Sequence, residues 1–468
     1  MSLPRPVLPV VVALALAGGV LVSTGATAGT PDRGAPLSFR RTVLASQGSY
    51  GEPSLAVTKD GKHIAVCVPG GSGDKVWWSG DDGHTFGTTA TDSTNGGGDC
   101  ELDFLPDGTL LSADLEVYDS NVKTSKDFGR TFDAGQAVGI EQDRQWFAHS
   151  ADGKTVYLAY HDFAAEGEFV ARSTDGGKTW PAQDAAIPVN GADQVTAPGV
   201  ASTPKRGMPA SLLDQGVNTF SGPMLLSPDG KDQYVLYSIS DAFSNATGGT
   251  PPFGPTRGIV VAHRAGGTGA FTDDYAVTND DGGTVNGAIF PWGTIDRAGN
   301  VYVLYNSDKG SPGHFHTWYV FSSDKAKTWS DPVKVDGAPL AQGAQVYATG
   351  QAGAPGVLDV AWYGADAATG ADDPKAVWDV HFAQVRGATS RHPQVDRSLI
   401  APDPIHRGDI CLNGLLCVAG GDRSLADFFE LVIGPDGMAQ VAYADNDGQP
   451  GGGRVVWAKQ TGGRSALR

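Results

Sequence analysis

Seven segments of the chain repeat one pattern, in which a glycine-containing turn leads into a run of apolar, β-branched and aromatic residues. A turn of this kind followed by such a run is typical of a β-hairpin. A second short strand precedes six of the segments and is unclear only before the sixth. The repeat therefore predicts an all-β chain. In sequence order the segments are 60–68 (DGKHIAVCV), 107–115 (DGTLLSADL), 152–160 (DGKTVYLAY), 229–237 (DGKDQYVLY), 298–306 (AGNVYVLYN), 355–363 (PGVLDVAWY) and 436–444 (DGMAQVAYA).

The spacing of these segments predicts how the strands are grouped. Successive segments begin 45 to 81 residues apart, as expected if insertions of unequal length lie in the loops. Each unit reads as strand, turn, strand, long loop, third strand, turn and fourth strand, and such units around one axis form a β-propeller. The last unit ends at its third strand, 453–460, so 38–45 (SFRRTVLA) is expected to add the outer strand and close the ring. We expect one propeller over 38–463, with seven blades, or six if one unit is an insertion.

The composition agrees with short strands joined by tight turns. The 468 residues include 65 glycines and 29 prolines, and only 18% are charged. The formal net charge of −18 disfavours binding to nucleic acid and to anionic membranes. Loop insertions are expected at 183–220, 240–256 and 388–425, and a C-terminal tail at 464–468. We expect the chain to be a monomer.

The N-terminus has the features of a secretory signal. Residues 7–22 are apolar, follow Arg5 and precede an A-x-A cleavage motif at 26–28. A membrane anchor is the alternative, but the run is shorter than the roughly 20 apolar residues of a spanning helix. We therefore expect 1–28 to be a signal peptide, 29–37 to be a linker, and the mature protein to be secreted and extracellular, with no membrane anchor.

The four cysteines permit three pairings. Cys67 and Cys100 fall on strands expected to be adjacent, whereas Cys411 and Cys417 flank five residues of an insertion. In an exported protein we expect the disulfides Cys67–Cys100 and Cys411–Cys417. A zinc site is disfavoured because no C-x-x-C motif is present.

A second motif, S-x-D-x-G-x-T followed by Trp or Phe, lies between the third and fourth expected strands of units one, two, three and five. Ser and Asp side chains accept hydrogen bonds from turn amides and Gly supplies a positive φ, so the motif is interpreted as one that stabilises a turn. A ligand or metal site at each Asp is disfavoured, because a catalytic group is rarely repeated around a ring. In the fifth unit Ala326 replaces the glycine, so that turn is expected to be strained or different. The motif residues are Ser79, Asp81 and Gly83; Ser125, Asp127 and Gly129; Ser173, Asp175, Gly177 and Trp180; and Ser322, Asp324 and Trp329.

This motif resembles the Asp-box, or bacterial neuraminidase repeat, of the sialidase-like β-propellers, and the resemblance covers 38–463. It implies the fold but not the activity, because Asp-boxes also occur in propellers that are not sialidases. Sialidases carry Y-R-I-P-[SA]-L at the first inner strand, whose arginine belongs to a three-arginine clamp on the substrate carboxylate. The matching stretch is 50–55 (YGEPSL), which has Gly51 and Glu52 in place of the Arg and Ile, so the chain resembles a sialidase relative without the usual clamp. No match to the sialidase acid/base or nucleophile is found. Candidates for rebuilding a clamp are Arg144, Arg257 and Arg423.

One face of the expected propeller is rich in acids. The starts of inner strands and the ends of second strands lie on this face, around the central channel, where sialidase-like propellers have their site. Carboxylates here could bind Ca²⁺, grip sugar hydroxyls beside Trp, or form an acid/base pair; the alternative is that Asp simply caps turns. Arg144 and Arg423 each follow an Asp and are expected to pair with the acidic ring. The candidate ligand-binding residues are Glu52, Asp99, Asp143, Arg144, Trp146, Trp292, Arg423 and Asp427.

Three functions remain open on the sequence. The leading hypothesis is recognition of an extracellular glycan or similar polyhydroxylated ligand at the acidic mouth of the channel, with Ca²⁺ as an optional cofactor and a carbohydrate or glycoconjugate as partner. The second is a glycoside hydrolase, with exo-sialidase as its named form. The third is a protein-binding scaffold, because propellers often present one face to a partner. A scaffold would show a broad exposed apolar patch.

Overall fold

The computed structural model describes most of the chain after residue 34. The described residues are 35–45, 51–91, 96–117, 119–139, 142–162, 167–186, 203–204, 217–241, 256–278, 290–311, 314–337, 343–365, 370–412, 417, 421–447 and 453–468. The expected signal peptide, most of the expected linker, and most of the insertions 183–220 and 240–256 lie outside them. Within these ranges no helix is long and apolar enough to cross a membrane.

The described strands form seven antiparallel four-stranded sheets, which are the blades. From the inner strand outward, blade one is β2 (Ser54–Val57), β3 (Ile64–Val68), β4 (Lys75–Ser79) and β5 (Gly87–Ala90), and blade two is β6 (Cys100–Phe104), β7 (Leu110–Leu115), β8 (Ser120–Ser125) and β9 (Gln136–Val138). Blade three is β10 (Gln142–His149), β11 (Val156–Asp162), β12 (Gly167–Ser173) and β13 (Ala182–Ala185), and blade four is β15 (Val217–Leu226), β16 (Gln233–Asp241), β17 (Thr256–Arg264) and β18 (Thr272–Thr278). Blade five is β19 (Trp292–Ile295), β20 (Val301–Ser307), β21 (His316–Ser322) and β22 (Val333–Lys334), and blade six is β23 (Gln345–Ala352), β24 (Val357–Ala365), β25 (Val377–Arg386) and β26 (Gln394–Leu399). The seventh is β28 (Glu430–Ile433), β29 (Ala439–Asp445), β30 (Arg454–Gly462) and β1 (Ser38–Ala45). Minor elements are β14 (Thr203–Pro204) beside β18, the 3₁₀ turn η3 (Ala265–Gly267), and β27 (His406–Arg407) beside β25.

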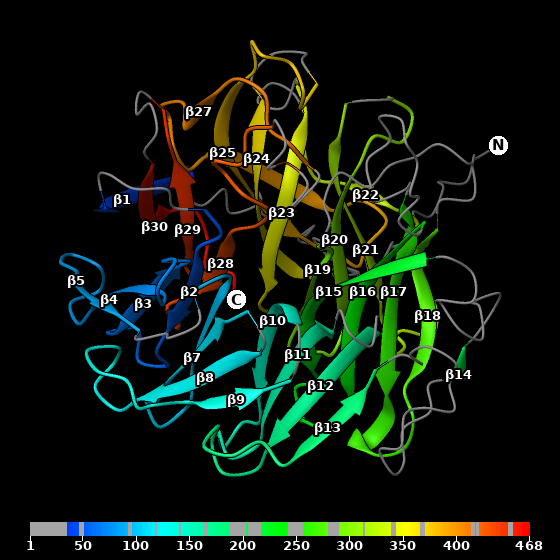
Figure 1. Ribbon diagram of the computed structural model, residues 1–468. Helices are drawn as coiled ribbons and strands as arrows, with labels where there is room; N and C mark the ends of the chain where they lie inside the picture. The colour runs from blue at the N-terminus through cyan, green and yellow to red at the C-terminus, as the bar shows by residue number, and fades with distance from the viewer. Residues whose placement is uncertain are drawn as a thin grey trace, which may run out of the picture. The chain divides into compact units, whose positions relative to one another are not determined.

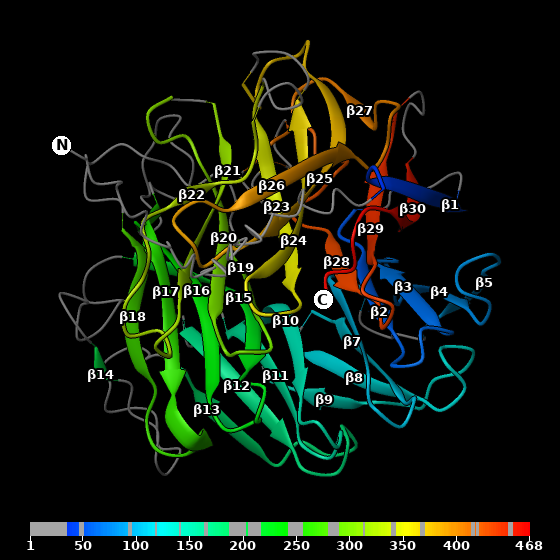
Figure 2. The same ribbon diagram turned by 180° about the vertical axis from the view of Figure 1, so that it is seen from behind.

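The seven sheets form a ring around one axis. The inner strands contact one another in the order β2, β6, β10, β15, β19, β23 and β28, and β28 returns to β2. Figure 1 shows the labelled inner strands near the centre with the other strands fanning outward, and Figure 2 shows the same order from behind. The fold is therefore a seven-bladed β-propeller, and the six-bladed alternative is excluded.

The ring closes through the N-terminal strand, as predicted. β1 pairs antiparallel with β30, with Phe39 opposite Gln460 and Thr42 opposite Trp457, and supplies the outer strand of the seventh blade. In Figure 1 the dark blue β1 lies beside the red β30. Residues 464–468 extend this closure: the amide of Ala354 in blade six donates to the carbonyl of Ala466, whose own amide donates to the carbonyl of Gly437 in blade seven, each at 2.8 Å.

The core lies between blades because every blade packs against two neighbours. Strands β3, β11, β20, β24 and β29 are buried along their whole length, which explains why their sequences are mostly apolar and do not alternate regularly between apolar and polar residues. A typical interface joins Leu55 and Val66 of blade one to Trp457 of blade seven. Burial on both faces therefore holds the blades in the ring.

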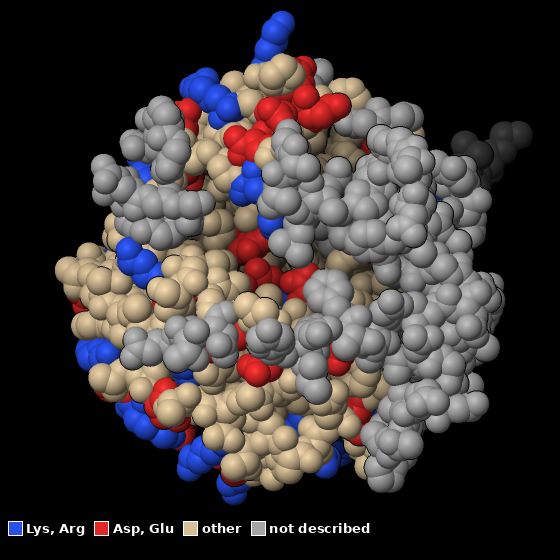
Figure 3. Space-filling model, viewed as in Figure 1, with Lys and Arg blue, Asp and Glu red and all other residues tan. Residues whose placement is uncertain are grey.

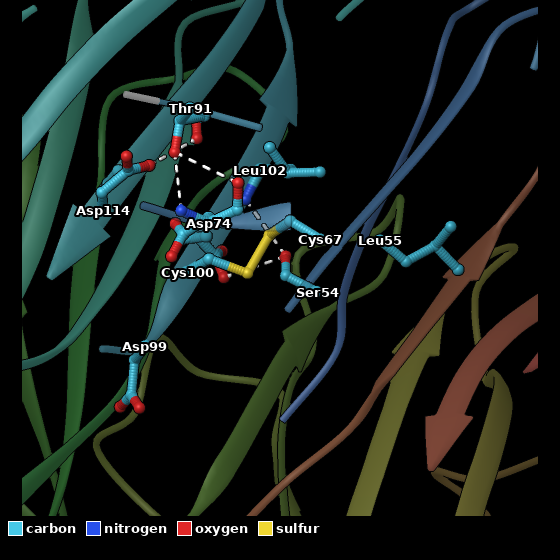
Figure 4. The surroundings of a disulfide bond; sticks show 12 residues. Ser54, Leu55, Cys67, Asp74, Thr91, Asp99, Cys100, Leu102 and Asp114 are labelled. Carbon is cyan, nitrogen blue, oxygen red and sulfur yellow. Dashed lines mark hydrogen bonds between the residues drawn. A yellow bond between two sulfur atoms is a disulfide. The ribbon is translucent and has the colours of Figure 1, made fainter. Parts of the chain in front are cut away.

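Both predicted disulfides are present. Cys67 of β3 bonds Cys100 at the start of β6, so the bond joins two neighbouring blades rather than two strands of one sheet. Figure 4 shows this bond below Asp74, with the Asp99 carboxylate pointing away from it. The second disulfide joins Cys411 to Cys417 in the insertion that follows blade six.

The S-x-D-x-G-x-T turns lie between the third and fourth strands of blades one, two, three and five. In the third blade the Ser173 hydroxyl donates to Asp175 at 2.7 Å and accepts the Gly177 amide at 3.0 Å. Asp175 also accepts the amide and hydroxyl of Thr179, and these bonds lower the pKa of Asp175 to about 2, with the Thr179 hydroxyl contributing most. The equivalent bonds recur in the other three turns.

The fifth-blade turn keeps this geometry despite its alanine. Ala326 has φ 60°, the conformation that glycine adopts in the other turns, and its amide still donates to the Ser322 hydroxyl at 2.9 Å. Its methyl group is buried in the core between blades four and five. The turn is therefore strained, as expected, but not different in its hydrogen bonds.

Candidate functional site at the channel mouth

Four neighbouring inner strands bring acidic residues to one end of the channel. Asp427 precedes β28, Glu52 precedes β2, Asp99 precedes β6, and Asp143 is the second residue of β10. Arg423 lies four residues before Asp427, and we call these five residues the mouth cluster. Figure 3 shows acidic side chains gathered in a hollow at the centre of one face of the molecule.

An arginine joins two of the four carboxyl groups. Nη2 of Arg423 lies 2.5 Å from Oδ2 of Asp427 and 3.3 Å from Oε1 of Glu52. The same Glu52 oxygen accepts the backbone amide of Asp427 at 3.3 Å. The predicted pairing of Arg423 with the acidic ring is therefore present, with Glu52 and Asp427 as its partners.

Burial and like charge raise the pKa values of Glu52, Asp143 and Asp427. Burial, followed by the charges of Asp99 and Asp427, raises the pKa of Glu52 well above its usual value. Burial also raises the pKa of Asp143 to about 7, with Asp99 adding to the shift. The pKa of Asp427 rises to about 6, again mainly through burial, although Arg423 opposes it. The site therefore holds carboxyl groups that exchange protons near neutral pH.

A histidine stands beside the cluster. His161, at the end of β11, lies opposite Asp143 in the β10–β11 ladder, and its Nδ1 is 2.9 Å from Oε1 of Glu168. Burial would lower the pKa of His161, but Glu168 and then Asp143 outweigh it and raise the pKa. Counting along the sequence places His161 at this face, but it was not among the candidate ligand-binding residues.

The backbone at the mouth adopts conformations that ordinary residues avoid. Glu52, Arg144, Tyr347 and Ala426 have φ values of 54°, 35°, 54° and 53°. The β10–β11 register shifts between Asp143 and Gln145, and the β23–β24 register shifts around Tyr347. Such bulges re-aim side chains at the ends of strands. They determine which side chains of the inner strands face the mouth.

Tyr347 belongs to this site but was not predicted. Burial raises its pKa, and the next largest effect comes from the Asp427 charge, followed by Arg423 and Glu52. Its hydroxyl donates to the Cys411 carbonyl at 3.3 Å, so Cys411 lies beside the Tyr347 ring. Tyr347 lies on β23, the inner strand of the one blade whose first strand was unclear in the sequence.

A second polar group lies deeper in the channel and consists of Ser54, Glu101, Arg144 and Glu430, which we call the inner cluster. The Ser54 hydroxyl donates to Glu430 at 2.7 Å and lies 3.2 Å from Glu101. Nη2 of Arg144 lies 2.8 Å from Oε2 of Glu101. Burial, then the Glu101 charge, raises the pKa of Glu430 well above its usual value. Glu101 thus pairs with the Arg144 guanidinium, whereas Glu430 bonds the Ser54 hydroxyl.

Three sequence-based candidates do not reach the mouth. Arg144 is fully buried; its guanidinium pairs with Glu101 instead of the acidic ring and stacks 3.6 Å from the centre of the Trp146 ring. Trp146 and Trp292 are only 1% and 6% exposed and pack edge to face at 5.2 Å. Neither tryptophan offers a face to a sugar in this structure. The side chain of Arg257 lies outside the described residues.

The metal interpretation gains no support from the described residues. Among them, no group of three or more His, Cys, Asp or Glu side chains has an arrangement that could hold a metal ion. Calcium requires several oxygen ligands directed at one point. In the mouth cluster, Oε1 of Glu52 and Oδ2 of Asp427 are directed at Arg423 instead. A Ca²⁺ site at the mouth therefore stays a prediction from the sequence.

Comparisons with known proteins identify a fold and no family. No protein-family profile matches the chain, and no curated protein matches it. Among solved structures, an ulvan lyase of polysaccharide lyase family PL25 is 13% identical, with a TM-score of 0.51 over 89% of this chain and 95% of the lyase. The α-L-arabinofuranosidase Arb93A of Fusarium graminearum is 11% identical, with a TM-score of 0.43 over 92% and 97% of the two chains. At this identity the lyase shares the propeller fold, and nothing more follows from the likeness.

Proposed function

We propose that this protein is an exported propeller that binds a glycan at the mouth cluster. The observation that carries the proposal is the convergence of four carboxyl groups from adjacent inner strands, with Asp99, Asp143 and Arg423 partly open to solvent. Carboxylates and a guanidinium accept and donate the hydrogen bonds that sugar hydroxyls need. Glycan binding therefore fits the chemistry of the site.

Three other features support this proposal. The ulvan lyase that shares the fold is a polysaccharide-acting enzyme by its description. The two disulfides are typical of proteins that fold in an oxidising compartment, which supports export. The hydrogen bonds of the four S-x-D-x-G-x-T turns support their assignment as Asp-boxes and a relation to the sialidase-like propellers.

Sialidase activity is not the form we favour. A side chain at Gly51, the position of the clamp arginine, would place its Cβ 2.4 Å from the Cβ of Ala426. The Arg144 guanidinium pairs with Glu101 below the mouth, so among the described side chains Arg423 is the clamp candidate that lies at the mouth. The mouth cluster contains four carboxyl groups and one guanidinium, and this excess of acid disfavours an anionic sugar.

Glycoside hydrolysis is a second candidate, favoured by the unequal pKa values at the mouth. Burial and then neighbouring acids raise the pKa of Glu52 well above its usual value, whereas for Asp427 the Arg423 charge opposes burial and holds the pKa at about 6. A protonated and an ionised carboxyl group in one site can act as general acid and base. In that role Glu52 would protonate the leaving oxygen, and Asp427 would activate water or attack the sugar.

The scaffold alternative has less support. Among the described residues, the large hydrophobic side chains that are exposed are Val43 and Val117. These two do not make the broad apolar patch that a protein-binding face would need.

Binding of immobilised polysaccharides by the purified full chain tests the proposal. We expect retention of at least one polysaccharide, and loss of that retention in Asp427→Asn. Asp403→Asn, which removes an acid whose side chain is 82% exposed, is the control and should bind normally. A protein that binds no glycan, or an Asp427→Asn variant that binds as well as the wild type, would contradict the proposal. Reducing-sugar release from the retained polysaccharide separates hydrolysis from binding.

A further inference from the structure

We propose that the mouth cluster selects a sugar that carries a free amine, such as a glucosamine unit, over neutral or anionic sugars. This inference rests on the proposed glycan binding and names its ligand class. The recognised group is an ammonium next to a hydroxyl. Two features point to this group: the charge of the cluster, and two of its polar atoms that have no hydrogen-bond partner in the described part of the chain.

The mouth cluster has more acid than base. It contains four carboxyl groups and one guanidinium, and Nη2 of Arg423 is already shared by Glu52 and Asp427. The nearby His161 is engaged by Glu168. Burial raises the pKa of Asp143 to about 7, so ionising it is costly unless a cation accompanies it. An ammonium from a ligand would supply that cation.

Two unpartnered atoms indicate the shape of the ligand group. Oδ1 of Asp427 is buried and has no hydrogen-bond partner among the described residues, and Asp427 is only 5% exposed. Nε of Arg423 is also buried, and no described residue accepts a hydrogen bond from it. The carboxylate oxygen requires a donor and Nε requires an acceptor. An ammonium and the oxygen of a neighbouring hydroxyl would satisfy both, which is the pairing that an amino sugar presents.

The competing ligand classes satisfy less of the site. A sugar carboxylate or sulfate would bring a further negative charge to Asp99, Asp143 and Asp427. An N-acetylated sugar lacks the positive charge. A divalent cation would leave Nε of Arg423 without an acceptor, and the described carboxyl groups do not form a metal-binding arrangement.

Proton release should accompany binding. Burial raises the pKa of Asp143 to about 7 and of Asp427 to about 6, so both are partly protonated near neutrality. A bound ammonium would lower these pKa values and expel protons. Affinity is therefore expected to rise between about pH 5 and pH 7. The groups that also face these carboxyl groups are Glu52, Asp99, His161, Tyr347 and Arg423.

Calorimetry with three matched tetrasaccharides, of glucosamine, N-acetylglucosamine and glucose, tests the inference on the full chain. We expect the glucosamine tetramer to bind at least about tenfold more tightly than the other two, with proton release in buffers of different ionisation enthalpy. Asp427→Asn should remove most of this preference, and Asp403→Asn should keep it. Arg423→Lys keeps the positive charge but removes Nε, and it should weaken the binding of all three tetramers.

The outcomes separate the two proposals. Equal binding of the glucose and glucosamine tetramers would overturn the amine preference and leave glycan binding intact. Binding of spermidine as tight as that of the glucosamine tetramer would overturn it as well, because the site would then attract any cation. Displacement of the tetramer by stoichiometric Ca²⁺ would overturn it in favour of a metal site. If Asp427→Asn does not fold, judged by its thermal transition, Asp143→Asn provides the same test.

Discussion

Replacing Asp143 with asparagine is expected to stabilise the protein above neutral pH. The partly buried carboxyl group of Asp143 has a pKa of about 7, whereas its reference value is 3.8. An acid whose folded pKa is raised above its unfolded pKa reduces stability as the pH rises through this interval, because the unfolded chain ionises first. The penalty is absent below about pH 4 and complete above about pH 7. Asparagine cannot ionise, but its oxygen can still accept the Arg144 amide that Asp143 accepts at 2.9 Å.

The size of the stabilisation follows from the pKa shift of Asp143. About 3 pH units correspond to about 4 kcal/mol, and we take half of this, about 2 kcal/mol, because Asp143 is partly exposed to solvent and screened. For a chain of this length the unfolding entropy is roughly 0.9 kcal/mol per degree, so Tm should rise by about 2 °C.

Thermal unfolding monitored at about pH 4 and pH 8 measures this difference. The Asp143→Asn variant and the wild type should melt together at the lower pH, and the variant should melt higher at the upper one. Asp403→Asn, at an exposed position, should show no such dependence. A variant that is less stable at the upper pH, or equally shifted at both pH values, would refute the reasoning.

Three further changes test the frame that holds the site. Gly177→Ala should lower the free energy of unfolding by about 1–3 kcal/mol, because φ is 84° and the new Cβ would lie 2.8 Å from a leucine side chain. Gly230→Ala, with φ 70° and open space around the new Cβ, should lower it by about 1 kcal/mol. Equal losses of the two variants in denaturant unfolding would contradict this expectation. Arg144→Met should lower the free energy of unfolding by about 3–5 kcal/mol in the same assay, since it leaves the buried Glu101 carboxylate without its ion-pair partner. Replacing Cys67 and Cys100 with serine should lower the free energy of unfolding by about 2–5 kcal/mol. An unchanged melting temperature would argue against a stabilising disulfide.

The parts of the structure that follow from local sequence were predictable. The S-x-D-x-G-x-T turn forms its bonds between residues of the motif itself, so its geometry depends little on the rest of the chain. The strands after each glycine turn are mostly apolar because both faces are buried. Counting back from those turns also placed Glu52, Asp99, Asp143 and Asp427 at the starts of inner strands.

The orientation of individual side chains was not predictable in this way. Counting assumes a regular strand, and one extra residue in a bulge turns a side chain to another direction. Arg144 sits in such a bulge, with φ 35°, and its guanidinium reaches Glu101 in the inner cluster rather than the mouth. Tyr347 reaches the mouth from a bulge in β23 for the same reason.

The pairing of β1 with β30 sets an order of assembly. Residues 38–45 leave the ribosome hundreds of residues before their partner strand 454–462 is made. Contacts so distant in sequence form slowly, because a long loop must close first. Until β30 is made and pairs with β1, the seventh blade lacks its third and fourth strands and the ring stays open. The Cys67–Cys100 bond joins residues that are closer in the sequence, so it can form earlier. Shortening either end of the chain should therefore impair the final step of folding rather than its beginning.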